Sequence, residues 1–160
     1  MNLLKLLIAV AIVFLLQTMV INRYPYFHLM DLFLLLNIYC ALNFNQMICM
    51  GISIPTGLIQ DVFSSKGIIG INAFSKTIIV FIISGLSSRL MLKHPLVILL
   101  LIAISTNLDY LIILGLHRLF GLDAFPLSGR TLLVASIINS VIGTITFQMT
   151  DRIRTKKEYV

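Results

Sequence analysis

The sequence predicts an all-α membrane protein with six transmembrane helices. Of its 160 residues, 59% are hydrophobic and 11% are charged, whereas about a quarter of the residues in an ordinary soluble domain are charged. The hydrophobic stretches are continuous and approach the roughly 20 residues that a membrane-spanning helix needs. They lack the alternation of apolar and polar residues that marks a transmembrane β-barrel. Composition and pattern therefore both favour a helical bundle in the bilayer.

Six hydrophobic segments follow one another with short connections. We expect helices over residues 3–21, 29–44, 47–63, 74–89, 95–114 and 131–149. The first segment resembles a secretory signal, since Lys5 precedes an apolar stretch, but it ends without a small-residue cleavage site and is interpreted as a retained helix. The third is interrupted by Gly51, Pro55 and Gly57. Such broken segments point to binding sites in membrane proteins, because the freed backbone groups must face protein or water.

An even number of helices returns the C-terminus to the side of the N-terminus. Placing both termini in the cytoplasm puts the larger share of Lys and Arg on the inner side, as the positive-inside rule requires. The last nine residues, RIRTKKEYV, carry four of the twelve basic residues and make the strongest contribution. We therefore expect one transmembrane domain over residues 1–150 and a basic cytoplasmic tail over 151–160, attracted by anionic membrane lipids. Without a soluble domain, binding of nucleic acid is not expected.

Three acidic residues and one lysine fall inside the hydrophobic segments. Each ionisable group there costs about 2.5–3.5 kcal/mol near the membrane centre and less toward the helix ends. The expected topology places Asp31, Asp61 and Asp109 toward the outer face. Asp61 ends one helix and Lys76 begins the next, so each charge opposes the dipole of its own helix. We expect these two residues to pair across the hairpin, with Lys66 as a further candidate.

The turn before the fourth helix has a motif of its own. Gly67 and Gly70 can adopt a positive φ, and Asn72 is a suitable N-cap for the helix that follows. Two roles stay open for this element on the residues alone. It serves the packing and folding of the bundle, or it forms a partner or cavity site with the four ionisable residues Asp31, Asp61, Lys76 and Asp109.

Small residues recur along the sixth predicted helix. Ser136, Ser140 and Thr144 follow at four-residue spacing, with Gly143 beside them. Small residues at this spacing let helices approach closely in lipid. The face predicts packing within the bundle, and it leaves open a contact with a partner's transmembrane helix or a homodimer.

Catalysis and metal binding find little support in the sequence. The histidines fall on three separate connections, which the topology divides between the two sides of the membrane: His28, His94 and His117. Cys40 and Cys49 lack the spacing of a zinc site and are interpreted as buried free thiols. Ser75 and Lys76 are adjacent, so on a helix they point about 100° apart and suit no Ser/Lys dyad. We expect no catalytic residue, metal or cofactor.

The stretch GLIQDVFSSKGIIGINAFSKTIIVF, which begins at Gly57, resembles the signature of the rod shape-determining protein MreD family. In that family a Gly-x-x-x-Asp on the third helix, here Gly57 and Asp61, precedes a short polar turn and a glycine near the head of the fourth helix, here Gly70. Chain length, six hydrophobic segments and a short basic C-terminus also fit. The resemblance implies a non-enzymatic, multi-pass protein of the bacterial cytoplasmic (inner) membrane.

The same resemblance implies a scaffold of the cell-elongation machinery. It would bind the bitopic protein MreC, and through MreC act with the cytoskeletal MreB and the peptidoglycan-synthesising enzymes. The family is also similar in fold to the S components of energy-coupling-factor transporters, which implies an outward-opening cavity. A small-molecule-binding transporter subunit is therefore the alternative function, although Ala9 and Ala11 do not match the A-x-x-x-A spacing with which S components dock.

Overall fold

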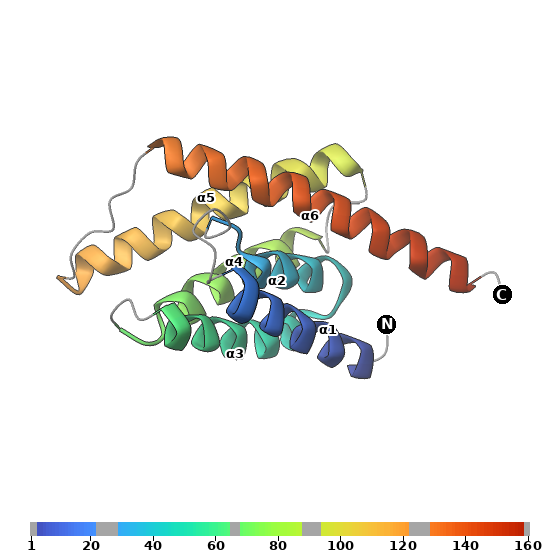
Figure 1. Ribbon diagram of the computed structural model, residues 1–160, viewed down its shortest axis with the longest axis horizontal. Coiled ribbons are helices and arrows are strands. Elements are labelled where there is room, and N and C mark those ends of the chain that lie inside the picture. The colour runs from blue at the N-terminus through green and yellow to red at the C-terminus, as the bar shows by residue number, and fades with distance from the viewer. Residues whose placement is uncertain (1–2, 22–28, 65–67, 88–93, 122–128, 159–160) are drawn as a thin grey trace.

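The computed structural model of the chain describes residues 3–21, 29–64, 68–87, 94–121 and 129–158 (Figure 1). Within these ranges every regular element is helical, so the predicted all-α class is confirmed. The elements are α1 (Leu3–Leu15), which continues into a π-helical segment η1 (Leu16–Ile21), α2 (Leu32–Asn43), α3 (Gln46–Ser64), α4 (Ile71–Ser87), α5 (Pro95–Leu119) and α6 (Gly129–Glu158).

The helices lie roughly along the long axis of the molecule and alternate in direction (Figure 1). α5 and α6 run in opposite directions and cross each other obliquely in contact, and α1 to α4 form the other side of the bundle. α1 begins and α6 ends at the same end of the molecule. We call the opposite end, where α4 and α6 begin and α3 and α5 end, the distal end; it lies on the left in Figure 1.

α2 is the central helix of the bundle. Every residue from Phe33 to Ala41 is buried, and the helix contacts α1, α3, α4, α5 and α6. A helix that is covered on all sides needs no polar face, which explains its nearly uniform apolar sequence. Cys40 lies in this core and Cys49 beside it on α3, both as buried free thiols.

α3 is one continuous helix, so the prediction that Gly51, Pro55 and Gly57 interrupt it is wrong. Proline in a helix removes one backbone hydrogen bond and frees a carbonyl group. The carbonyl group that loses its backbone donor is that of Gly51, four residues before Pro55. The neighbouring Thr56 hydroxyl adds bonds in the same turn, to the carbonyl oxygens of Ile52 at 2.9 Å and Ser53 at 3.0 Å.

Helix length supports a membrane-spanning fold. Among the described residues two helices are long and apolar enough to cross a bilayer, Pro95–Leu119 and Gly129–Thr150. Shorter apolar helical segments cover Ile8–Met19, Leu32–Asn43 and Ile71–Ser87. α6 continues to Glu158 instead of ending near residue 149 as predicted, so residues 151–158 extend the helix.

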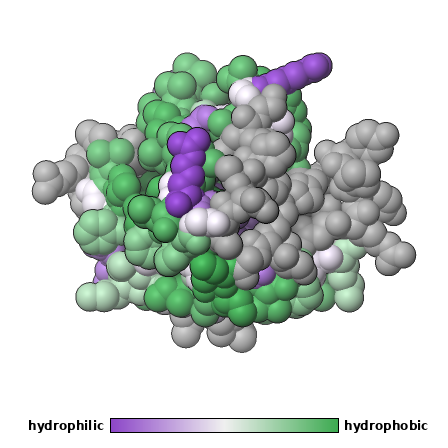
Figure 2. All heavy atoms as spheres, turned by 90° about the vertical axis from the view of Figure 1, so that its left-hand side faces the viewer, coloured by the Kyte–Doolittle hydropathy of each residue, from purple (hydrophilic) through white to green (hydrophobic). Residues whose placement is uncertain are grey.

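The surface agrees with an apolar environment. Large hydrophobic side chains are exposed on all the long helices; on α6, for example, they recur every four residues as Leu133, Ile137, Val141, Ile145 and Met149. Figure 2, which looks onto the distal end, shows a mostly hydrophobic described surface from which a few hydrophilic side chains protrude. The polar chemistry is instead concentrated inside the bundle.

Candidate functional site

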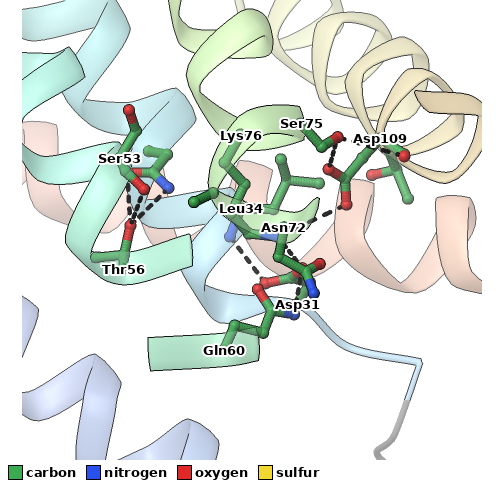
Figure 3. Close-up of polar contacts among 12 residues, drawn as sticks. Asp31, Leu34, Ser53, Thr56, Gln60, Asn72, Ser75, Lys76 and Asp109 are labelled. Atoms are coloured by element: carbon green, nitrogen blue, oxygen red, sulfur yellow. Dashed lines mark hydrogen bonds and ion pairs between the residues drawn. The ribbon is translucent and has the colours of Figure 1, made fainter. Parts of the chain in front are cut away.

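Lys76 lies at the centre of a group of three charged residues, Asp31, Lys76 and Asp109 (Figure 3). We call it the buried charge cluster, although the Asp31 side chain is 17% exposed. The lysine is fully buried. Its Nζ lies 2.9 Å from Asp31 Oδ2 and 3.7 Å from Asp109 Oδ2. The three residues come from the start of α2, the first turns of α4 and the second half of α5. One side chain therefore links three helices that are distant in the sequence.

Asp31 has two tasks in the cluster. Its Oδ1 accepts the backbone N–H of Leu34 at 2.9 Å, which makes it the N-cap of α2. Its Oδ2 accepts hydrogen bonds from Lys76 Nζ and, at 3.0 Å, from the Gln60 amide on α3. An aspartate satisfies the free N–H groups of a helix start and favours the positive end of the helix dipole. Both effects stabilise the ionised form of Asp31.

Two amide side chains hold the backbone around Asp31 in place. Gln17 on η1 accepts the Leu32 N–H at 2.9 Å and donates to the Met30 carbonyl oxygen at 3.3 Å. Asn139 on α6 accepts the N–H of Asp31 at 3.1 Å. These contacts tie the start of α2 to the first and last helical regions of the chain. The sequence reasoning missed both residues, although a buried polar residue in an apolar helix is a usable signal.

The Asp109 carboxyl group is contacted mainly by side chains of α4. The Ser75 hydroxyl donates to Asp109 Oδ1 at 2.5 Å, and Lys76 follows Ser75 on the same helix. Asp109 is only 4% exposed. It lies inside α5 rather than at its start, so neither free backbone N–H groups nor the positive helix end support its charge. Its surroundings therefore differ from those of Asp31.

The predicted pairing of Asp61 with Lys76 is wrong. The Asp61 carboxylate instead caps the beginning of α4: it accepts the backbone N–H groups of Gly70 at 2.8 Å, Asn72 at 3.0 Å and Ala73 at 3.4 Å. The charge that opposes the dipole of its own helix complements that of its antiparallel neighbour. Lys76 turns the other way, toward the acids of α2 and α5. Lys66, the other candidate partner, lies outside the described residues.

The turn before α4 departs from the prediction at one position. α4 begins at Ile71, so Asn72 lies within the first helical turn and is not the N-cap; its side chain donates to Asp61 Oδ1 at 2.8 Å. Gly70 has φ 114°, a backbone conformation that glycine adopts without strain. Gly67 lies outside the described residues.

At Gly57 the backbones of α3 and α4 lie in close contact. A Cβ atom built on it would lie 2.2 Å from Ala73 Cα and 2.5 Å from Ala73 N. Only a residue without a side chain fits against backbone at that distance. The glycine of the Gly-x-x-x-Asp motif therefore sets the separation of the two helices, and Asp61 one turn later bonds to the same stretch of α4.

A second group of buried polar residues connects α2, α3 and α4. The Asn37 amide on α2 donates to the Thr56 hydroxyl on α3 at 3.0 Å. Ser53 on α3 lies 3.1 Å from the Thr77 hydroxyl on α4. Asn37, Ser53 and Thr56 are completely buried, and the sequence reasoning assigned them no role.

The small-residue face of α6 points into the bundle. Ser136, Ser140 and Thr144 are buried. The Ser136 hydroxyl bonds with α5, donating to the Ala103 carbonyl oxygen at 3.2 Å. A Cβ on Gly143 would meet side-chain atoms of Leu35 and Ile102 at 2.7 Å. This face is thus occupied by helices of the same chain.

An all-helical fold with apolar helices of membrane-spanning length and inward-turned charges defines a membrane protein. Comparison with protein families then identifies the family of membrane proteins to which the chain belongs. The family described as rod shape-determining protein MreD matches residues 1–152, and the chain belongs to this family. MreD proteins are bacterial membrane proteins with a role in determining rod shape, and the family is not a known enzyme family. No curated protein and no solved structure matches the chain.

Proposed function

We propose that this protein is a non-enzymatic, multi-pass component of the bacterial inner membrane that binds MreC. Through MreC it helps to regulate peptidoglycan synthesis and rod shape together with MreB and the peptidoglycan-synthesising enzymes. The observation that carries the proposal is the family match, which extends over residues 1–152 and thus over nearly all of the chain.

The arrangement of the polar groups supports a scaffold. Asp31, Asp61, Lys76 and Asp109 each bond to another helix of the same chain or to the turn before it. Groups engaged in this way fix helices relative to one another, as polar contacts between membrane helices do. The exposed hydrophobic faces of the long helices are left for lipid or for a partner's transmembrane helix.

The proposal includes six membrane spans with both termini in the cytoplasm, and one transmembrane domain over residues 1–150. Three observations support it. The helices alternate in direction, α1 begins and α6 ends at the same end, and α5 and α6 are each long enough to span. The basic residues after Thr150 would then face the anionic inner surface of the membrane.

Co-purification tests the proposal. The full chain is expressed with MreC from the same genome, extracted in mild detergent and captured by a tag, with an unrelated single-span protein as the control bait. We expect MreC to be retained and the control protein to be lost. Absence of MreC together with a tightly bound small molecule in the purified protein would overturn the scaffold and favour the transporter-like binding subunit.

A further inference from the structure

The buried charge cluster contains more negative than positive groups. Asp31 and Asp109 are both acidic, and Lys76 is the cation that both contact. With all three groups ionised, the cluster would carry a net charge of −1 in a setting where Lys76 is 0% and Asp109 4% exposed. An uncompensated charge in such a setting is strongly unfavourable, and a buried group normally neutralises instead.

The surrounding elements do not remove this excess within the described residues. α3 contributes the neutral Gln60 amide to Asp31, while Asp61 at the end of α3 is a further acid, bonded to the backbone at the start of α4. α6 contributes the neutral Asn139 and η1 the neutral Gln17. On α5 itself, Tyr110 directly follows Asp109, and a tyrosine hydroxyl is uncharged at neutral pH.

Asp31 and Asp109 differ in how strongly their surroundings stabilise a negative charge on the carboxyl group. Asp31 accepts three hydrogen bonds, from Lys76, Gln60 and the Leu34 N–H, at the positive end of α2. Asp109 accepts one side-chain bond, from Ser75, and its contact with Lys76 at 3.7 Å exceeds hydrogen-bond length. The Ser75 hydroxyl can accept from a carboxylic acid as well as donate to a carboxylate. Protonation of Asp109 therefore keeps that contact.

We propose that the buried charge cluster is a binding site for one proton, held on the Asp109 carboxyl group at neutral pH. The proton comes from water, adds to a carboxylate oxygen and returns to water when the pH is raised; no other bond is made or broken. With the proton bound, Asp31 and Lys76 form a neutral ion pair and Asp109 a neutral neighbour. After its loss, two carboxylates share one lysine where α5 meets α2 and α4.

Infrared spectroscopy of the purified full chain in lipid nanodiscs tests this directly and requires no MreC. A protonated carboxyl group gives a C=O band separate from those of carboxylates and amides, and the band shifts in D2O. We expect this band in the wild type at neutral pH and its loss in alkaline buffer. It should be absent from Asp109→Asn and retained in Asp151→Asn, the matched control on the part of α6 beyond its apolar span.

A wild-type spectrum without a protonated carboxyl band at neutral pH would overturn the proposal, as would a band that survives in Asp109→Asn. Thermal unfolding provides a second measurement, because asparagine resembles the protonated acid. Asp109→Asn should unfold close to the wild-type temperature and Asp31→Asn well below it. Equal losses in the two variants would contradict the assignment of the proton to Asp109.

Discussion

At the scale of single residues, Lys76 has the most demanding environment in the molecule. Its side chain is fully buried, and its ammonium group has one carboxylate at hydrogen-bond distance and a second carboxyl group slightly farther away. Breaking a buried ion pair by removing one partner leaves the other charge uncompensated, which is far more costly than the net value of the pair. The stability of the bundle should therefore depend on this one amine.

Replacing Lys76 by methionine, which keeps most of the side-chain volume, should destabilise the folded protein by about 3–5 kcal/mol because Asp31 loses its cation. Thermal or denaturant unfolding of the detergent-solubilised protein measures the loss. The double variant Asp31→Asn/Lys76→Met should lose much less than the sum of the two single variants, since it removes both charges. Additive losses would show that the two groups do not interact.

The sequence predicted which ionisable residues lie inside the hydrophobic segments, but it did not predict which of them contact one another. Asp61 and Lys76 were expected to pair because they flank one turn, whereas the contact actually formed joins Lys76 to Asp31, 45 positions away. Sequence distance along a hairpin fixes the depth of a residue but not the side of the helix on which it lies. The cap at α4 could not be foreseen for a related reason, since its acceptor comes from a different helix.

At the scale of helices, the crossing of α3 and α4 depends on Gly57. The backbone of Ala73 lies where a side chain on residue 57 would be, and Asp61, one turn further along α3, accepts N–H groups of α4. Gly51, on the same helix, has open space around an added Cβ. The two glycines therefore form a natural pair for comparison.

Gly57→Ala should separate α3 from α4 and destabilise the protein by about 1–3 kcal/mol, the usual cost of overpacking. Gly51→Ala should leave stability unchanged or raise it by up to about 1 kcal/mol, because alanine is the better helix former. Unfolding measurements on both variants under the same conditions compare their free energies of unfolding with that of the wild type. Similar effects of the two substitutions would argue against the close crossing.

The hydrophobic segments correctly predicted that the helices exist. They did not predict where each helix begins and ends, or whether it is interrupted. All six predicted helices occur. α4 starts at Ile71 rather than at residue 74, because Asp61 supplies its capping contacts from outside. α3 stays whole despite Pro55 while it packs closely against α4 at Gly57 and Ala73. In both cases a contact in the folded state overrides the local preference of the sequence.

At the scale of the whole molecule, Asp151 and Glu158 lie on the last turns of α6, whereas the alternation of the helices places Asp31, Asp61 and Asp109 toward the distal end. In the proposed orientation this end faces the periplasm and the basic end of α6 faces the cytoplasm. The orientation determines which side of the protein is available to the periplasmic and the cytoplasmic parts of the cell-elongation machinery.

Reporter fusions test that orientation. A phosphatase that is active only in the periplasm should be active when inserted in the connection between α5 and α6, and inactive when fused after residue 160 or before residue 1. A fluorescent protein that folds only in the cytoplasm should give the opposite pattern. Termini on opposite sides of the membrane would contradict an even number of spans.

The contact of Lys76 with Asp31 also has a consequence for how the protein is made. Chains emerge from the ribosome N-terminus first, so Asp31 enters the membrane before Lys76 and Asp109 after it. The lysine therefore finds its closest counter-ion, at 2.9 Å, already present when α4 inserts. The ion pair of Asp31 and Lys76 can thus form during translation, and α5 joins an assembly whose central lysine already has a counter-ion.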